Sequence, residues 1–124
     1  MTLKEAIEKF DREVKNNIPS EIKIDWLSLL DSAIYTDIIL THENPEHISF
    51  NGYTTDTDDN TRLLVPEPFS DIYLRFLTIK KDLYLSDISR YNNDVILYST
   101  AYRDFENYYN RNNMPIKKTQ YFNV

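Results

Sequence analysis

A chain of 124 residues is long enough for one domain with a buried core and too short for two. Its single glycine excludes a P-loop, a dinucleotide-binding fingerprint and a nucleophile elbow, and the absence of cysteine excludes a disulfide scaffold and thiol chemistry. With 14 basic against 20 acidic residues, the net charge of −6 is opposite to what a protein that wraps nucleic acid requires. We therefore expect a non-enzymatic domain that carries no cofactor and binds neither nucleic acid nor membrane.

The N-terminal part of the chain predicts two helices. Thr2 and Glu5 have the spacing of a capping box, and the apolar residues that follow recur with helical periodicity, which predicts a helix over 3–15. Ser20 is expected to cap a second helix over 21–41, near whose start acidic residues favour the helix dipole. The apolar face of this second helix is wide enough to contact more than one neighbour.

The next segment is expected to form a small β ribbon. Residues 47–53 and 61–66 predict two strands, and the polar, acidic segment 54–60 predicts the loop between them. An alternative hairpin closes directly at Asn51-Gly52 and leaves the second strand without a partner. A two-stranded ribbon is marginally stable alone, so it must pack on the helices or on another subunit.

Two further helices are expected in the C-terminal half. Apolar positions step by three or four from Ile72 to Leu83, and an aromatic row continues at the same spacing from Tyr91 to Tyr109. The two rows are one residue out of register across 86–89, where the helix either bends or breaks, and we favour a break.

These patterns together predict the fold class. We expect a mainly α protein, a small bundle of four to five helices with a two-stranded β ribbon inserted between helices 2 and 3. Residues 1–111 form the helical domain, with the ribbon at about 47–66, and residues 112–124 form an extended C-terminal tail.

One local pattern resembles a metal site. Asp56, Asp58, Asn60 and Glu67 occupy positions 1, 3, 5 and 12 of a calcium-binding loop. However, Thr61 stands where the sharp turn of such a loop needs glycine. We therefore favour a solvated acidic loop over a calcium site.

The remaining polar residues do not predict catalytic chemistry. His42 and His47 are five residues apart across a proline, a spacing that does not place two imidazoles on one helical face. Asp58 and Asp59 are adjacent on an expected surface loop, where no desolvation separates their pKa values. We expect no catalytic residue.

The aromatic residues are expected mainly to fill the core, and contacts with another protein are their candidate functional role. The aromatic row of the last helix is mainly a core stripe, but Tyr108 lies off this stripe and is a candidate for an exposed docking patch. The C-terminal tail is either disordered or an arm that orders on a neighbouring protein. The candidate interface residues are Phe50, Tyr53, Tyr108, Arg111, Pro115, Lys117, Lys118, Tyr121 and Phe122.

Four segments together resemble small structural proteins of tailed bacteriophages and prophages, and most of all their head–tail connector (adaptor) family. They are Trp26-Leu27-Ser28, Leu63-Leu64-Val65-Pro66-Glu67-Pro68-Phe69, Arg90-Tyr91-Asn92-Asn93 and Tyr102-x-x-Phe105-x-x-Tyr108-Tyr109-Asn110-Arg111. The resemblance covers nearly the whole chain, and its motifs are packing and turn motifs.

The resemblance implies a structural virion protein that joins the capsid to the tail. Copies of such a subunit form a ring, commonly of twelve, below the portal protein and around the channel through which DNA passes without being specifically bound. Its further partner would be another neck or tail-completion protein, and it has no catalytic residue to carry over. Another small phage neck or tail protein, a cytosolic regulatory or antitoxin-like helical domain and a calcium-stabilised module are the alternatives.

Overall fold

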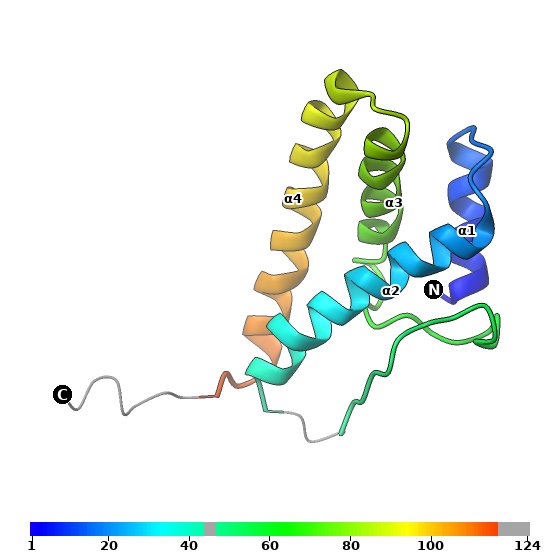
Figure 1. Ribbon diagram of the computed structural model, residues 1–124. Coiled ribbons are helices and arrows are strands. Elements are labelled where there is room, and N and C mark those ends of the chain that lie inside the picture. Colours follow the sequence, from blue (N-terminus) through cyan, green and yellow to red (C-terminus); the bar gives the residue numbers. More distant parts are fainter. Residues whose placement is uncertain (44–46, 117–124) are drawn as a thin grey trace.

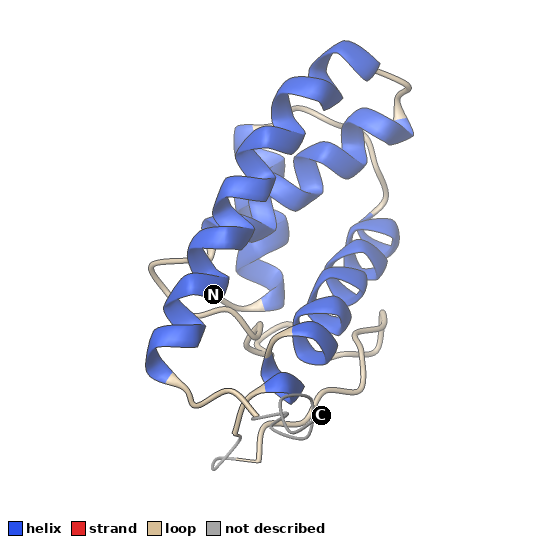
Figure 2. Ribbon diagram, turned by 90° about the vertical axis from the view of Figure 1, so that its left-hand side faces the viewer, coloured by secondary structure: helices blue, strands red, loops and turns tan. Residues whose placement is uncertain are grey.

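The computed structural model describes residues 1–43 and 47–116 of the chain. Its elements in order are α1 (Leu3–Glu13), α2 (Ser20–Asp37), the 3-10 helix η1 (Ile39–Thr41), α3 (Asp71–Tyr84) and α4 (Ile88–Asn112). The expected mainly helical fold is confirmed, and Figure 2 shows helices joined by loops.

Helix α3 lies at the centre of the bundle. It packs along α4 and also contacts α1 and α2, and in Figure 1 α4, α3 and α1 stand in a row that α2 crosses obliquely. Among the described helices, α3 alone lies in close contact with α4. Helix α4 is therefore an edge helix with one long side left uncovered.

The first helix begins as the sequence predicts. The Thr2 side chain accepts a hydrogen bond from the Glu5 amide at 3.2 Å, and the Glu5 carboxylate accepts one from the Thr2 amide at 2.8 Å. Leu3, Ala6 and Phe10 lie on the buried face, and the helix ends at Glu13, two residues before the predicted end.

The start of α2 differs from the prediction. Pro19 occupies the cap position with φ −60° and ψ 145°, and Ser20 is already the first helical residue, so the expected Ser20 cap is wrong. A proline suits this position because its fixed φ leads directly into a helix. The end of the segment tightens into η1, so the helix predicted over 21–41 is two elements.

The predicted β ribbon is not confirmed. Within the described part of 47–66 there is no strand, and residues 61–63 run beside the N-terminal residues instead. The Leu3 amide donates to the Thr61 carbonyl at 2.9 Å, and the Leu63 amide donates to the Met1 carbonyl at 3.0 Å. Because the N-terminal residues take these hydrogen bonds, segment 61–66 has no need of 47–53 as a partner.

The predicted break between the last two helices is confirmed. Helix α3 ends at Tyr84, and α4 begins after Asp87, whose side chain accepts a hydrogen bond from the Arg90 amide at 3.2 Å. Ser86 reverses the chain with a positive φ of 57°. The result is an antiparallel helical hairpin whose turn lies at one end of the molecule (Figure 1).

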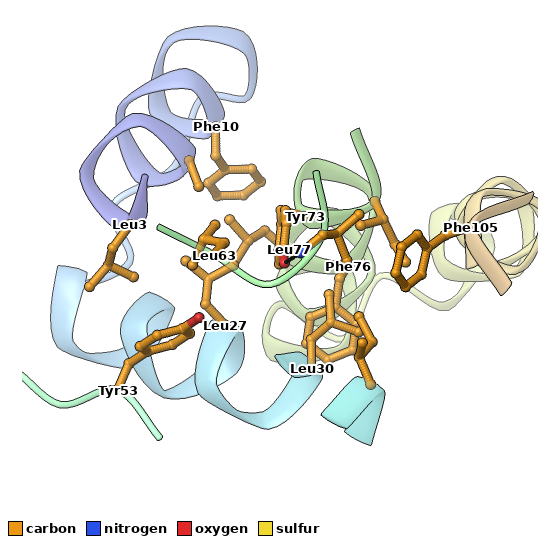
Figure 3. Packing of buried hydrophobic residues seen from close by; sticks show 14 of the residues in the cluster. Leu3, Phe10, Leu27, Leu30, Tyr53, Leu63, Tyr73, Phe76, Leu77 and Phe105 are labelled. Carbon is orange, nitrogen blue, oxygen red and sulfur yellow. Dashed lines mark hydrogen bonds between the residues drawn. The ribbon is translucent and has the colours of Figure 1, made fainter. Parts of the chain in front are cut away.

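The core joins all four α-helices and the loop before α3. Figure 3 shows Phe10, Leu27, Tyr73 and Phe105, from α1, α2, α3 and α4, pointing into one cluster of apolar side chains. Phe105 is the one fully buried residue of α4, and the other aromatic residues of its predicted stripe are half-buried against the core. The interpretation of the stripe as packing is therefore confirmed.

Candidate protein-interaction surface

A buried carboxylate holds the loop before α3 onto the helices. Asp31 of α2 is fully buried and accepts hydrogen bonds from the Tyr53 hydroxyl at 2.5 Å, the Tyr73 hydroxyl at 2.7 Å and the Leu64 amide at 3.1 Å. The Tyr73 hydroxyl also accepts a hydrogen bond from the Val65 amide at 2.7 Å. Burial raises the pKa of Asp31, while its hydrogen bonds oppose that rise. The groups satisfy one another, so this cluster supports the fold rather than a reaction.

The buried Asp31 carboxylate also affects the pKa values of the two tyrosines in this cluster. Burial, together with the nearby charge of Asp31, raises the pKa of both Tyr53 and Tyr73. Both hydroxyls therefore stay protonated and remain hydrogen-bond donors to the carboxylate.

A second buried carboxyl lies between α3 and α4. The side chain of Asp82 is fully buried, and its Oδ1 atom is 3.4 Å from the Lys81 Nζ atom. Burial, followed by hydrogen bonding to Asp94 and repulsion by its charge, raises the pKa of Asp82 to about 6. Because the Asp82 carboxyl is closed to solvent, no substrate reaches it, and the pair acts on stability.

The calcium-loop residues are not assembled into a site. In the described part of the chain, no group of three or more histidine, aspartate or glutamate side chains is placed to hold a metal ion. The Asp58 carboxylate accepts a hydrogen bond from the Asn60 amide at 2.8 Å, and the nearest cation to Glu67 is the N-terminal amine, 4.0 Å away. Asp56 points to solvent as an exposed loop residue.

The two histidines are not brought together as ligands. His42 is buried, with Nδ1 2.6 Å from the Ile38 carbonyl and Nε2 2.6 Å from the Asn110 side-chain oxygen. The ring thereby ties the end of α2 to the end of α4, whereas His47 is exposed.

The predicted aromatic contacts of the loop lie in the core rather than on a free surface. Tyr53 is 5% exposed and its hydroxyl binds Asp31, which corrects the expectation that it meets a neighbouring subunit. Phe50 is half-buried, with its ring 6.2 Å from that of Tyr35.

The side chain of Tyr108 is also less exposed than the sequence suggests. Its ring lies 4.6 Å from the ring of Phe69 and 6.4 Å from that of Phe105, so it packs on the core as a half-buried residue. Phe69 of the loop before α3 thus covers part of Tyr108, and a contact of Tyr108 with another protein stays a prediction.

The predicted contacts near the C-terminus divide between described and undescribed residues. Arg111 and Pro115 are exposed, and Pro115 forms a bridge with His42. The Ile116 amide donates to the Thr41 carbonyl at 2.9 Å, which continues this pairing. Lys117, Lys118, Tyr121 and Phe122 lie outside the described residues.

Exposed apolar side chains concentrate on the α3–α4 hairpin. We call the exposed residues between 72 and 103 the hairpin surface. Of the ten large hydrophobic residues that are exposed in the described chain, six belong to it: Leu83, Tyr84, Leu85, Ile88, Ile96 and Leu97. Their exposed fractions reach 64% at Ile96. Apolar side chains gathered in this way are typical of surfaces that contact another molecule.

Acidic side chains have the opposite distribution. Of the 20 acidic residues, 14 are exposed, three are half-buried, two are buried and one lies outside the described residues. None of the 14 exposed ones falls within 72–103, where the exposed charged residues are Arg75, Arg90 and Arg103. Arg75 and Arg90 are paired with Asp71 at 3.0 Å and with Asp87 at 3.4 Å, so the hairpin surface is mainly apolar on a protein that is otherwise acidic.

The uncovered side of α4 also carries a depression of about 390 Å³. It is lined by Tyr98, Ser99, Tyr102, Arg103 and Glu106. Tyrosine and arginine are the residue types that protein interfaces favour most, so the depression extends the hairpin surface toward the middle of α4.

The scarcity of acidic residues between 72 and 103 is the sequence feature that could have indicated the hairpin surface. The prediction from the sequence did not use it. Asp82, Asp87 and Asp94 interrupt the acid-poor stretch when letters alone are counted. Only the fold shows that Asp82 is buried and that the other two are half-buried.

The chain was compared with family models, curated proteins and solved structures. No family model matches it, no curated protein is similar to it, and no solved structure matches it. Among the described helices, none combines the length and the apolar character needed to cross a bilayer.

Proposed function

We propose that this protein is a structural, non-enzymatic subunit of a tailed-phage virion, a head–tail connector that forms a ring of its own copies below the portal. The observation that carries the proposal is the hairpin surface, which combines six exposed large hydrophobic residues with the absence of exposed acidic side chains in 72–103. Such a surface is costly to leave in water and fits a subunit that works by contact with other proteins.

The buried polar groups support a passive role. The Asp31 cluster and the Asp82 carboxyl are buried in the bundle, so their unusual electrostatics serve the fold rather than a substrate. The resemblance of four packing and turn segments to connector proteins supplies the particular place in the virion, with the portal and another neck or tail-completion protein as partners.

The acidic remainder of the surface agrees with a channel for DNA. Side chains such as Asp56, Asp58 and Asp59 are exposed and negative, and negative groups repel phosphates. A wall of this kind lets DNA pass without gripping it.

Electron micrographs of assembled particles that carry a label on this subunit test the placement. The proposal expects the label at the junction of head and tail. Native mass spectrometry with and without portal protein tests the assembly, which should show a ring and a ring–portal complex. A stable one-to-one complex with a single cellular protein, and no ring, would favour the regulatory or antitoxin-like alternative.

A further inference from the structure

The last turn of α3 buries two opposite charges beside each other. The side chains of Lys81 and Asp82 are 8% and 0% exposed, and the Lys81 Nζ atom lies 3.4 Å from the Asp82 Oδ1 atom. A buried carboxylate needs hydrogen-bond donors to replace the water that it loses. Within the described part of the chain, however, neither oxygen of Asp82 has a hydrogen-bond partner, and the contact with the ammonium lacks hydrogen-bond geometry.

A second carboxyl faces Asp82 from the other helix of the hairpin. Asp94 of α4 is half-buried and acts on Asp82 through both hydrogen bonding and charge. The ammonium of Lys81 can balance one of these two carboxylates. The cluster is therefore neutral only when the two carboxyls together hold one proton.

The charged groups of the neighbouring elements do not supply a second cation. Lys23, the other buried lysine of the described chain, is paired with Asp11, and this pair joins α2 to α1. Arg90 of α4 is paired with Asp87 at 3.4 Å. Among the described residues, no cation other than Lys81 forms an ion pair with Asp82 or Asp94.

We propose that Asp82 and Asp94 share one proton, which latches α3 to α4 beside the hairpin turn. The proton on the buried Asp82 carboxyl is donated to the Asp94 carboxylate, which gives Asp82 the hydrogen bond that it otherwise lacks. Asp94 carries the negative charge because it is the carboxyl in contact with water. The inference goes beyond the proposed function and does not depend on it.

The position of Asp82 connects this latch to the hairpin turn. The Asp82 carbonyl accepts a hydrogen bond from the Asp87 amide at 2.8 Å, and the Lys81 carbonyl accepts one from the Leu85 amide at 2.9 Å. Loss of the proton leaves two carboxylates facing each other, and water reaches Asp82 only when this end of the hairpin opens. Leu85 and Ile88, 58% and 56% exposed, belong to the part of the hairpin surface that then changes shape.

Hydrogen exchange of the turn amides tests the latch in the isolated full chain. The pKa of Asp82 is about 6 in the closed hairpin, against an ordinary value of 3.8 in a hydrated one. The opening constant measured at the Leu85 and Asp87 amides, corrected for the intrinsic exchange rate, should therefore rise about tenfold between pH 5 and pH 7. The Phe10 amide in α1 should show no such rise, which distinguishes local opening from unfolding.

The Asp82→Asn variant should abolish the rise. Its side-chain amide can donate the same hydrogen bond to Asp94 but cannot ionise. Asp104→Asn removes an exposed carboxylate of α4 and should behave as wild type. A wild-type chain without the rise overturns the inference, and so does a rise that persists in Asp82→Asn.

The Asp94→Asn variant tests whether the proton is shared. Without the charge of Asp94, Asp82 faces Lys81 alone and ionises at lower pH, so the opening constant should rise less than about threefold between pH 5 and pH 7. Carbon-13 NMR of the wild-type carboxyls should show Asp82 and Asp94 titrating together in two coupled steps. Two independent titrations, or an Asp94→Asn variant with the full tenfold rise, would exclude a shared proton.

The single tryptophan of the chain provides a second measurement of the opening. The Trp26 ring of α2 lies 5.9 Å from the ring of Tyr84, at the end of α3. The fluorescence of Trp26 should therefore change between pH 5 and pH 7 in wild type and stay constant in Asp82→Asn. An equal change in both proteins has a source other than the latch and counts against it.

These measurements separate the inference from the proposed function, because none of them requires a particle or a partner. If the exchange and titration results are as expected but labelled particles lack the subunit at the head–tail junction, the latch stands and the proposed function fails. If the label is found at the junction but the turn amides show no dependence on Asp82, the proposed function stands and the latch fails.

Discussion

Asp31 is the residue on which the attachment of the long loop depends. It receives hydrogen bonds from two tyrosine hydroxyls and one backbone amide, all within the core. Asp31→Ala leaves these donors unpaired, so we expect the free energy of unfolding to fall by about 3 kcal/mol or more. Urea unfolding followed by circular dichroism measures the change.

Two tyrosine variants provide a comparison for the stability loss expected of Asp31→Ala. Tyr53→Phe removes one of the donors and should cost about 1–2 kcal/mol, while Tyr35→Phe changes a half-buried tyrosine outside the cluster and should cost less than about 0.5 kcal/mol. Equal costs for Asp31→Ala and Tyr35→Phe would show that the cluster does not hold the loop.

Asp82 should make the stability depend on pH in an unusual direction. Folding raises the pKa of its carboxyl from the ordinary value of 3.8 to about 6, because the site is buried and faces Asp94. The folded state therefore holds the proton more tightly than the unfolded state. The stabilisation that the protonated Asp82 carboxyl contributes is complete below about pH 4. It is lost as the pH rises through about 6.

The Asp82→Asn substitution should remove the loss of stability that accompanies ionisation of this carboxyl. We expect the variant to gain about 2 kcal/mol in unfolding free energy relative to wild type between pH 4 and pH 7, since the amide cannot ionise. Asp104→Asn, at an exposed position on α4, serves as the control and should leave the pH profile unchanged. A constant difference between Asp82→Asn and wild type across this range would contradict the prediction.

At the scale of the elements, the turn between α3 and α4 sets the hairpin. Ser86 adopts a φ of 57°, a conformation that costs a residue with a side chain about 1 kcal/mol and costs glycine little. Ser86→Gly should therefore raise the unfolding free energy by about 0.5 kcal/mol. Ser99→Gly, in the middle of α4, should lower it by about 0.5 kcal/mol, because glycine weakens a helix interior. Thermal unfolding of both variants tests the contrast.

The helices could be predicted because their causes are local. The capping box at Thr2 and the one-residue register shift across 86–89 both depend on neighbours in the sequence, and both are confirmed. The ribbon was mispredicted because its outcome depends on distant partners. Residues 61–63 hydrogen-bond to the first three residues of the chain, and Tyr53 turns inward to meet Asp31, and no alternation of residue types shows either contact.

For the whole molecule, the hydrogen bonds of residues 114–116 limit how much of the predicted tail can be deleted without touching the fold. Met114 and Ile116 are held by backbone hydrogen bonds to Glu43 and Thr41 at 2.7 and 2.9 Å, so a deletion that keeps these bonds begins at residue 117. Deleting 117–124 should leave the circular dichroism spectrum and the unfolding midpoint unchanged while lowering the affinity for portal protein. Unchanged portal binding would exclude the tail from that contact.

The surface charge of the whole molecule predicts its behaviour toward DNA. Fourteen exposed acidic residues and a net charge of −6 should prevent measurable binding to double-stranded DNA even at low salt, where phosphate contacts are strongest. Gel mobility shift at low ionic strength tests this prediction. A retarded band that disappears with added salt would contradict the passive wall described above.

The candidate surface was harder to predict than the fold, for a physical reason. Exposure belongs to the folded chain, and the hairpin surface can be recognised only when Asp82 is seen to be buried and Asp87 and Asp94 half-buried. Of the residues expected to make contacts, Tyr53 is buried in the core and Tyr108 is half-buried against it.

The position of Asp31 has a consequence for limited proteolysis. Its carboxylate binds Tyr53 on one side of the exposed segment 54–60 and Leu64 on the other. A protease that cleaves within this segment would therefore give two fragments that co-elute as one particle and separate only in denaturant. The same arrangement should allow the two halves of the chain, expressed apart, to reassemble by complementation.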